Sequence, residues 1–440
     1  MPRRMRFDGL DAWLDWQLGL HPQPIEPGLE RVERVARRTG WSPPDCPVIT
    51  IGGTNGKGSC VALADSILRA GGYRTGTFTS PHLVSYVERI RLQGQAVSAA
   101  SLVVSFERIA DALGPDTLTF FEFNTLAALL IFETAEPDAI VLEVGMGGRL
   151  DAVNIVDADV AVVVSLGIDH AEWLGADLES IAREKAGIFR AGRPAVYGGE
   201  EPPPDSLIEA AHAEGALLRI RGRDFREVRR ATGRWDLVLG KQEAAERLAD
   251  LPAPALAGIA QIGNAATTIT AIRELQSRLP LTVDAIARGL ERVALPGRFE
   301  RIADRDVEWI LDVAHNPAAA RVLAASLRAT QGRGRTIAVC GMLADKDVPA
   351  VLAELRGCVD TWIAATTEGP RGLDGIELAR RASTVNLDLH PGGGIGEAMH
   401  FARSRVREGD RIVVFGSFHT VGPALEELAR AGVVAGHGRL

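Results

Sequence analysis

Short runs of β-branched and other apolar residues alternate along most of the chain with stretches in which apolar residues recur every three or four positions. The runs VITI (48–51), AIVLEV (139–144) and VAVVVS (160–165) lack the polar alternation of a half-exposed strand, so they predict strands that are buried on both faces. Stretches such as VALADSILRA and SIAREKAGIF have helical spacing. This alternation predicts an α/β fold with a mostly parallel sheet covered by helices.

The pattern changes twice along the chain. Helical segments at 10–18 and 28–38 come before the alternating region. After residue 200 the regularity weakens, and the turn-flanked pieces LLRIRG and RWDLVLG predict a small peripheral sheet. From WILDVAHN onward, strands and helices alternate again. We predict two domains, residues 1–295 and 296–440, with the chain crossing between them at VALPGRFERI and a smaller, Rossmann-like α/β domain at the C-terminal end.

Composition excludes several classes of function. The chain has 440 residues, 46% of them hydrophobic, which is enough for a large core. Its net charge of -8 offers no basic surface for nucleic acid or anionic lipid. No apolar run has the length of a membrane helix, and the N-terminus lacks the apolar core of a signal peptide. We therefore expect a cytoplasmic protein that binds neither nucleic acid nor membrane. The four cysteines lack C-x-x-C spacing, which predicts reduced packing thiols rather than a zinc site.

The stretch VITIGGTNGKGSC (48–60) is the strongest candidate for a ligand site. It departs from the usual phosphate loop, G-x-x-x-x-G-K-[ST], because Ile51 occupies the first glycine position and Gly58 separates Lys57 from Ser59. Its Asn-Gly pair would also suit a hairpin turn. However, a helical pattern follows, and a glycine loop between a strand and a helix lets backbone N–H groups and a lysine surround a phosphate. The stretch therefore predicts a nucleotide site, with the turn as the alternative.

Polar groups at two further strand ends extend this site. Glu143 ends the run AIVLEV, and His170 follows Asp169 at the end of VAVVVSLGIDH. Ligands of open α/β sheets bind at the carboxyl ends of the strands. Magnesium prefers oxygen ligands, which suits Glu143 and Ser80 better than an imidazole. Taken alone, Glu143 could be satisfied by nearby N–H groups and His170 could be a packed histidine, so the residue pattern indicates a magnesium–nucleotide site and no more.

A series of motifs in one order then carries a family resemblance. The motifs are GTNGKGS (53–59), FTSPHL (78–83), LEVGMGGRLDAVN (142–154), DHAEWLG (169–175), EKAGIF (184–189), PGRFE (296–300), LDVAHNP (311–317), GMLADKD (341–347) and GSFHTV (416–421). With these motifs the chain resembles folylpolyglutamate synthases, in particular the bacterial bifunctional dihydrofolate synthase/folylpolyglutamate synthases of the Mur ligase group. The Mur-type loop, G-T-x-G-K-[GT]-[ST], accounts for both departures from the usual phosphate loop.

The resemblance implies an N-terminal P-loop ATPase domain of the Mur ligase type and an ATP-dependent amide ligase. Its substrates would be 7,8-dihydropteroate or tetrahydrofolate, L-glutamate and ATP, with an acyl phosphate as the intermediate. Two other functions are considered. A Mur ligase for a peptidoglycan precursor would be expected to carry a uridine-nucleotide domain before residue 53, and a nucleotide-dependent switch would not need the second domain. We expect a monomer.

The resemblance also assigns the residues of the nucleotide and metal site. Phosphate and ATP contacts are expected from Gly56, Lys57, Gly58, Ser59, Asn264, Arg298, Asp312 and His315. Magnesium ligands are expected from Ser80, Glu143, His170 and Lys185, with Lys57, Lys185 and His170 as the catalytic groups. Lys185 would carry a carbamate made with CO₂, which turns a cation that repels magnesium into an oxygen ligand. Without the resemblance, Lys185 would be interpreted as a surface lysine, Asn264 as a helix N-cap and Arg298 as a surface charge.

For the pterin acid, the resemblance implies three stretches. They contain Glu26, Pro27, Gly28, Leu29, Thr119, Phe120, Phe121, Glu122, Leu150, Asp151 and Ala152. In the first stretch, E-P-G-L differs from the D-L-G-L form associated with the family, and the two phenylalanines could equally be core residues. Ser417 and His419 are suggested to help bind glutamate. A hinge near 290–298 would let the two domains close and exclude water from the acyl phosphate.

Overall fold

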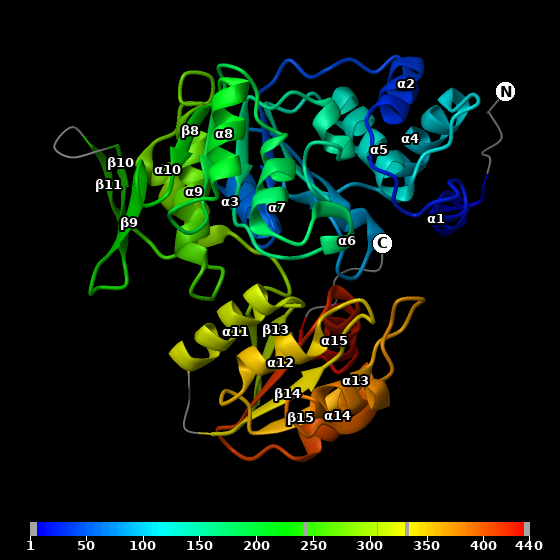
Figure 1. Cartoon of the computed structure of the whole chain (residues 1–440), viewed down its shortest axis with the longest axis vertical. Helices are drawn as coiled ribbons and strands as arrows, with labels where there is room; N and C mark the ends of the chain where they lie inside the picture. Colours follow the sequence, from blue (N-terminus) through cyan, green and yellow to red (C-terminus); the bar gives the residue numbers. More distant parts are fainter. Residues whose placement is uncertain (1–6, 241–244, 306, 331–333, 435–440) are drawn as a thin grey trace.

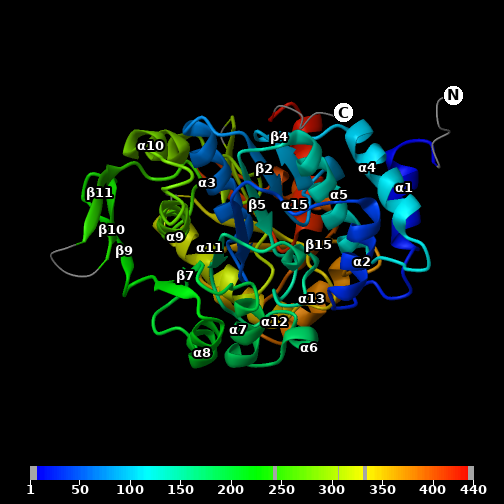
Figure 2. The ribbon, with the colours of Figure 1, turned by 90° about the horizontal axis from the view of Figure 1, so that it is seen from above.

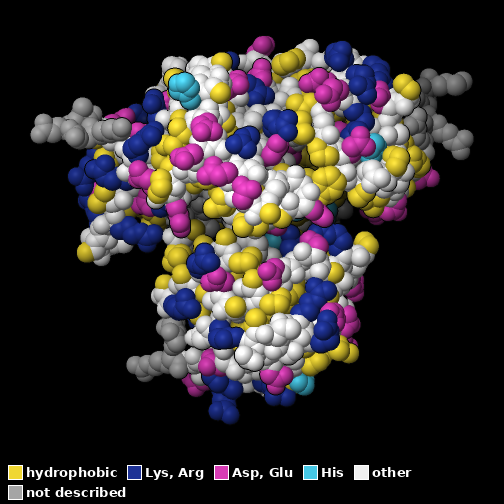
Figure 3. Space-filling model, in the orientation of Figure 1, with side chains coloured by type: hydrophobic (Ala, Val, Ile, Leu, Met, Phe, Trp, Pro, Cys, Tyr) yellow, Lys and Arg dark blue, Asp and Glu magenta, His cyan; other side chains and the backbone are white. Residues whose placement is uncertain are grey.

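The computed structural model describes residues 7–240, 245–305, 307–330 and 334–434. The chain forms two lobes that meet at a narrow waist (Figures 1 and 3). In Figure 1 the upper lobe holds the blue, cyan and green segments, and the lower lobe holds the yellow to red segments. Among the described residues, no helix has both the length and the apolar content needed to cross a membrane.

An eight-stranded sheet in the order β4-β3-β2-β5-β1-β6-β7-β8 forms the centre of the upper lobe. In sheet order, β2, β5, β1, β6, β7 and β8 pair in parallel with their neighbours. At one edge, β3 is antiparallel to β2, and β4 is antiparallel to β3. The strands are β1 (Val48–Gly52), β2 (Thr75–Phe78), β3 (Ile90–Leu92), β4 (Gln95–Ala96), β5 (Ala139–Glu143), β6 (Val160–Val163), β7 (Pro194–Tyr197) and β8 (Leu217–Ile220). The predicted, mostly parallel α/β sheet is confirmed.

Helices cover both faces of this sheet, which is why its strands are apolar throughout. Ile49 and Ile51 of β1 pack with α3, α9 and α10, while Val48 faces the core formed by α4 and α5. Figure 2 shows these two groups of helices on opposite sides of β5. The helices of the lobe are α1 (Leu10–Leu18), α2 (Glu30–Thr39), α3 (Lys57–Ala70), α4 (Ala99–Ala112), α5 (Phe120–Ala135), α6 (Ala171–Leu174), α7 (Leu178–Ala186), α8 (Asp205–Glu214), α9 (Gln261–Arg273) and α10 (Val283–Arg292), with the 3-10 turns η1 (Tyr86–Arg89) and η2 (Ala152–Ile155).

A small antiparallel sheet projects from the upper lobe (Figure 1). It contains β9 (Phe225–Arg229), β10 (Trp235–Leu239) and β11 (Glu246–Leu251), so the prediction of a peripheral sheet is confirmed for RWDLVLG. It is wrong for LLRIRG. That segment forms β8, which pairs in parallel with β7 and becomes the edge of the large sheet after the crossover through α8.

The lower lobe has a six-stranded sheet in the order β12-β13-β17-β14-β15-β16. The edge strand β12 is antiparallel to β13, and the other neighbours pair in parallel. Its elements are β12 (Glu300–Asp304), β13 (Val307–Asp312), α11 (Pro317–Ala329), β14 (Thr336–Cys340), α12 (Val348–Leu355), β15 (Thr361–Thr366), α13 (Gly375–Ser383), β16 (His390–Gly394), α14 (Ile395–Ser404), β17 (Arg411–Phe415) and α15 (Phe418–Arg430). The loops that follow β1 and β6 face this lobe at the waist, since Asn55 and Asp169 both bond to Asn316.

Candidate active site

The predicted phosphate loop connects β1 to α3, as a nucleotide loop requires. Gly56 is the N-cap of α3 and has a φ of 84°. A Cβ there would lie 3.0 Å from Val164 Cγ1 and 3.1 Å from Asn264 Oδ1, so both the backbone angle and the space call for glycine. The backbone N–H groups at the start of α3 are free to face an anion. The hairpin alternative is wrong, because α3 begins at Lys57.

Lys57 lies at the centre of the charged groups in the loop region. Its Nζ donates hydrogen bonds to the carbonyls of Gly53, at 3.1 Å, and Thr54, at 3.4 Å. The same ammonium affects the pKa of Glu143, Asp151, His170 and Lys185. The Lys57 ammonium therefore bonds the loop and also acts electrostatically on the proposed metal ligands and on Asp151 of the neighbouring cavity.

Glu143 is a buried carboxylate beside the phosphate loop. Burial raises its pKa, and the charges of Lys57 and Arg298 act in the opposite direction. Its Oε2 accepts a hydrogen bond from the Ser80 N–H at 3.3 Å. A Cβ on Gly58 would lie 3.6 Å from the same oxygen and 3.7 Å from Arg298 Nη2, so these three predicted residues meet. A carboxylate with so little internal satisfaction fits a cation ligand.

Arg298 lies between the two lobes at this point, close to Glu143 of the upper lobe and Asp312 of the lower lobe. The Arg298 guanidinium lies 4.9 Å from the centre of the Phe418 ring, and burial lowers its pKa. Asp312 accepts hydrogen bonds from the N–H groups of Phe299, at 2.9 Å, and Ala314, at 2.8 Å. Asp312 therefore also holds Phe299, whose φ is 50°, in the left-handed region.

Asn264 and His315 flank the loop from the two lobes. Asn264 lies inside α9 and donates to Gln261 Oε1 at 3.1 Å, so it is not the N-cap that the residue pattern alone suggested. His315 Nδ1 bonds the Val313 carbonyl at 2.9 Å, and its Nε2 lies 3.5 Å from Asp169 Oδ2. Ser59 is buried in the first turn of α3.

Lys185 is buried on the last turn of α7 and is not a surface lysine. Only 4% of the residue is exposed. Burial, with a further contribution from Lys57, lowers its pKa to about 7. Within the described ranges, no carboxylate forms an ion pair with its ammonium. An unpaired buried lysine of low pKa is a nucleophilic amine at neutral pH.

His170 is the N-cap of α6 and has a φ of 52°, and burial lowers the pKa of its imidazole. Its ring makes no hydrogen bond to any described residue. In the described part of the chain, no three His, Cys, Asp or Glu side chains gather as metal ligands. The predicted set of Ser80, Glu143, His170 and Lys185 contains only two residues of these types and stays a prediction.

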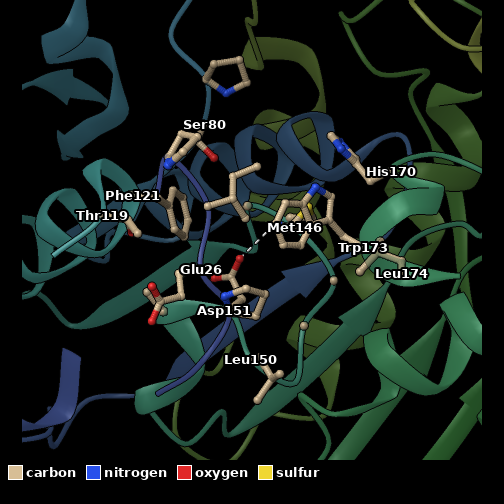
Figure 4. A pocket seen from close by; sticks show the side chains of 18 of the residues that line it. Glu26, Ser80, Thr119, Phe121, Met146, Leu150, Asp151, His170, Trp173 and Leu174 are labelled. Carbon is tan, nitrogen blue, oxygen red and sulfur yellow. Dashed lines mark hydrogen bonds between the residues drawn. The ribbon is translucent and has the colours of Figure 1, made fainter. Parts of the chain in front are cut away.

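A cavity of about 480 Å³ adjoins these groups and lies between the lobes. Ser80, His170, Phe121 and Asp151 line it from the upper lobe, and Ser417 and His419 line it from the lower lobe. In Figure 4, Ser80 and His170 lie at the upper end of the view, and Phe121, Asp151 and Trp173 lie below them. The cavity therefore runs from the proposed metal ligands toward a predominantly apolar chamber.

Asp151 is a buried carboxylate in the wall of that chamber. Burial raises its pKa to about 6. It accepts hydrogen bonds from the N–H groups of Met146, at 2.9 Å, and Val153, at 3.1 Å, and the first of these is drawn in Figure 4. Phe121 lines the same chamber, and its ring would collide with a Cβ on Gly145, 2.6 Å from Cζ. Leu150 and Ala152 also line it.

The other predicted pterin residues have different positions. Glu26, Pro27 and Gly28 lie at the rim of the cavity, and Thr119 and Glu122 lie in its wall. Glu122 accepts hydrogen bonds from Thr119 N–H and Oγ1 and from Arg31, so its carboxylate is used within the protein.

The structure does not bring Leu29 and Phe120 to the cavity wall. The Phe120 ring instead lies 5.5 Å from the Arg89 guanidinium and 6.1 Å from the Tyr86 ring.

Several residues at the cavity were not predicted from the sequence. Arg31 does not line the cavity itself but donates hydrogen bonds to Glu26 and Glu122, which do. Trp173 is 42% exposed at the cavity rim, and Lys346 and Arg371 line it from the lower lobe. Trp173 and Lys346 fall inside the motifs DHAEWLG and GMLADKD, which is the only signal that the sequence offered for them.

Comparison with known proteins now bears on this geometry. The Mur ligase middle domain matches residues 51–216, and the Mur ligase, glutamate ligase domain matches residues 297–418. The dihydrofolate synthase/folylpolyglutamate synthase of Escherichia coli (strain K12) is 43% identical over 422 residues, which is 95% of each chain. The chain belongs to the dihydrofolate synthase/folylpolyglutamate synthase family. The predicted resemblance and the ATP-dependent ligase class are thereby confirmed.

Solved structures agree with the fold. The E. coli protein in complex with DHPP and ADP superposes with a TM-score of 0.90 at 42% identity, covering 97% of this chain and 99% of the other. A bifunctional folylpolyglutamate synthase/dihydrofolate synthase with Mn, AMPPNP and L-glutamate bound gives a TM-score of 0.87 at 41% identity, covering 96% and 98%. The relatives thus bind adenine nucleotides and a divalent cation in the same fold.

Proposed function

We propose that this chain joins L-glutamate to dihydropteroate, giving dihydrofolate, and to tetrahydrofolate, giving folylpolyglutamate, with ATP cleaved to ADP and phosphate. The observation that carries the proposal is the single cavity that touches Asp151, the proposed metal ligands Ser80 and His170, and Ser417 and His419 of the opposite lobe. A pterin acid, the terminal phosphate of ATP and an amino acid could all meet there. The relatives solved with DHPP, with nucleotides and with L-glutamate support this choice.

ATP is assigned to the waist. Gly56, Lys57, Gly58 and Ser59 would surround its phosphates, because they present the N-terminus of α3 and one lysine. Arg298 and Asp312 would bind from the linker and the lower lobe, with Asn264 and His315 on the two sides. Lys57 would exchange its bonds to the Gly53 and Thr54 carbonyls for phosphate oxygens, which neutralise its charge better.

Magnesium is assigned to Ser80, Glu143, His170 and Lys185. A bound magnesium ion would neutralise charge on the transferred phosphoryl group. The ammonium of Lys185 cannot hold a cation, but its neutral amine can add to CO₂ and release a proton to form a carbamate. The low pKa of Lys185 supports this modification, because much of the amine is neutral near pH 7. The carbamate would then supply a further oxygen ligand.

The acceptor is assigned to the chamber around Asp151. A pterin presents adjacent N–H groups, which a carboxylate can accept, and a flat ring, which can pack against Phe121. Its aromatic acid would point toward Lys57 and Glu143. Glu122 is proposed to support the chamber without touching the pterin. Its bonds to Arg31 and Thr119 fix the start of α5 and thereby the position of Phe121.

The reaction then follows from these positions. One oxygen of the acceptor carboxylate attacks the γ-phosphorus, and ADP leaves. Lys57 and the N–H groups of the loop stabilise the charge that spreads over the transferred group. The neutral amine of L-glutamate, held near Ser417 and His419, next attacks the acyl carbon. Phosphate leaves, and the amide remains. Closure of the lobes would exclude water, which would otherwise hydrolyse the acyl phosphate.

Mass spectrometry of the products tests the assignment. Dihydropteroate and tetrahydrofolate are each incubated with ATP, magnesium and L-glutamate. The proposal expects each acceptor to gain glutamate residues, with phosphate release that requires both acceptor and glutamate. Growth of tetrahydrofolate alone would remove the first activity, and phosphate release without either substrate would contradict ligation. The expectations of a monomer, a cytoplasmic location and a domain boundary near residue 296 stay predictions.

A further inference from the structure

Asp169, Asn316 and Lys346 form a polar cluster that bridges the two lobes. Asp169 follows β6 in the upper lobe, whereas Asn316 caps α11 and Lys346 precedes α12 in the lower lobe. Lys346 Nζ lies 3.0 Å from Asp169 Oδ1, and Asn316 Nδ2 donates to Asp169 Oδ2 at 3.1 Å. The Lys346 and Asp169 side chains are 10% and 13% exposed. Separation of the lobes would therefore break the Asp169 contacts with Asn316 and Lys346, and Lys346 would keep only the longer, 3.6 Å contact with Asp345.

The same cluster reaches the phosphate loop through Asn55. The amides of Asn55 and Asn316 exchange hydrogen bonds of 3.1 Å in both directions. Asn316 Oδ1 also accepts the Ala319 N–H at 2.9 Å, so the N-cap of α11 fixes this side chain. On the other side, the N–H of Asn55 is bonded to Ser165 Oγ at 3.0 Å. The lower lobe thus contacts the loop through Asn316, whose side chain is held in place by its hydrogen bond to the Ala319 N–H.

Asp169 also holds the backbone of its neighbour His170. Asp169 Oδ1, the oxygen that pairs with Lys346, accepts the His170 N–H at 3.0 Å. His170 has a φ of 52°, in the left-handed region that non-glycine residues seldom adopt. The Asp169 oxygen that holds the His170 backbone in this region is therefore the same oxygen that pairs with Lys346 of the lower lobe.

We propose that Asp169 is a positioning residue that makes cation binding at the phosphate loop depend on docking of the lower lobe. The proposal rests on the proposed function for the role of His170 as a metal ligand. With the lobes docked, Lys346 and Asn316 fix the Asp169 carboxylate, which fixes the His170 backbone. With the lobes apart, the carboxylate rotates into water and the ligand set loosens. ATP is then cleaved only after closure, when water is excluded.

The test uses the whole protein with Mn²⁺ and AMPPNP, without folate or glutamate. Asp169→Asn, Lys346→Met and the double variant are compared with wild type by Mn²⁺ titration in electron paramagnetic resonance and by compaction in small-angle X-ray scattering. Arg321→Gln is the control, because it removes an ion pair of the lower lobe, between Arg321 of α11 and Glu354 of α12, that does not include Asp169. Lys346→Arg tests rescue, and circular dichroism checks folding.

We expect each single variant to bind Mn²⁺ about tenfold or more weakly and to lose the compaction caused by AMPPNP, as outer partners of metal ligands usually affect affinity. The double variant should be no worse than the weaker single variant, Lys346→Arg should recover part of the affinity, and Arg321→Gln should match wild type. Wild-type Mn²⁺ affinity and compaction in Lys346→Met would overturn the proposal. So would a metal-independent loss of AMPPNP affinity, which would make Lys346 a nucleotide ligand. If the proposed function is wrong, the product assay will show no glutamate added to the folate, and the Mn²⁺ and scattering measurements will not be affected.

Discussion

Replacing Lys185 with methionine tests whether its buried amine carries a carbamate. The pKa of Lys185 is lowered from 10.5 to about 7 by burial and by the nearby Lys57. At pH 7.5 roughly three quarters of such amines are neutral, against about one in a thousand for an ordinary lysine, so the neutral amine is about 700 times more abundant. The structure thus prepares this lysine for modification.

The assay compares wild type and Lys185→Met in CO₂-depleted buffer and in bicarbonate. We expect wild-type turnover to fall on depletion and to recover with bicarbonate, while the variant loses about 100-fold or more in kcat under both conditions, since a metal ligand is absent. Mass spectrometry of rapidly trapped wild-type protein should show the added mass of one CO₂ on Lys185. Arg183→Met, which removes an exposed cation from the same helix, is the control and should behave as wild type.

The unmodified protein adds a pH test of the same reasoning. Because the folded pKa of Lys185 is lowered, the unfolded chain binds the extra proton between about pH 7 and 10.5. Stability of CO₂-free wild type, relative to Lys185→Met, should therefore rise with pH through this window and be lowest below pH 7. The carbamate account of Lys185 would be refuted by three results together. Turnover would not depend on bicarbonate, trapped wild-type protein would show no added mass, and the difference in stability between wild type and Lys185→Met would not change with pH.

The remaining predictions concern the acceptor chamber. Gly145→Ala places a Cβ 2.6 Å from Phe121 Cζ. Because overpacking costs about 1–3 kcal/mol, we expect the KM for dihydropteroate to rise about tenfold while the KM for ATP is unchanged. Steady-state kinetics in which both KM values rise together would contradict this. Arg31→Met leaves Glu122 buried without its guanidinium and should lower the free energy of unfolding by about 2 kcal/mol, measured by urea denaturation; an unchanged midpoint would show that Arg31 is not the partner that matters. Burial raises the pKa of Asp151 to about 6, so its charge costs stability above that pH, and the cost disappears as pH falls toward 3.8. Asp151→Asn replaces one of the two oxygens that accept backbone N–H groups with an NH₂ group. It should weaken acceptor binding in isothermal calorimetry, and tight binding by the variant would count against Asp151 as the pterin ligand.

The sequence predicts local structure best where one pattern acts alone. The β-branched runs become β1, β5 and β6, and a glycine loop followed by a helical pattern places the start of α3. LLRIRG was assigned to the wrong sheet because strand pairing is a long-range choice: its partner β7 lies across the α8 crossover. Short apolar segments carry no mark of the sheet they join.

The site was predicted residue by residue through family motifs, and its limits have physical causes. Phe120 and Phe121 differ in orientation by their places on α5, a helix that is apolar on most of its surface, so periodicity cannot tell which ring faces the cavity. Arg31 and Glu122 are 91 positions apart, and nothing local indicates their pairing. The cluster of Asp169, Asn316 and Lys346 arises only when the two lobes meet.

Isotope transfer tests the central claim most directly. Dihydropteroate labelled with heavy oxygen in both carboxylate positions is allowed to react with ATP and L-glutamate, and the released phosphate is analysed by mass spectrometry. Attack of the acceptor carboxylate on the γ-phosphorus predicts that each phosphate carries one heavy oxygen and that the amide of the product keeps the other. Unlabelled phosphate released in step with ligation would contradict the acyl-phosphate route and with it the assignment of the waist between the lobes.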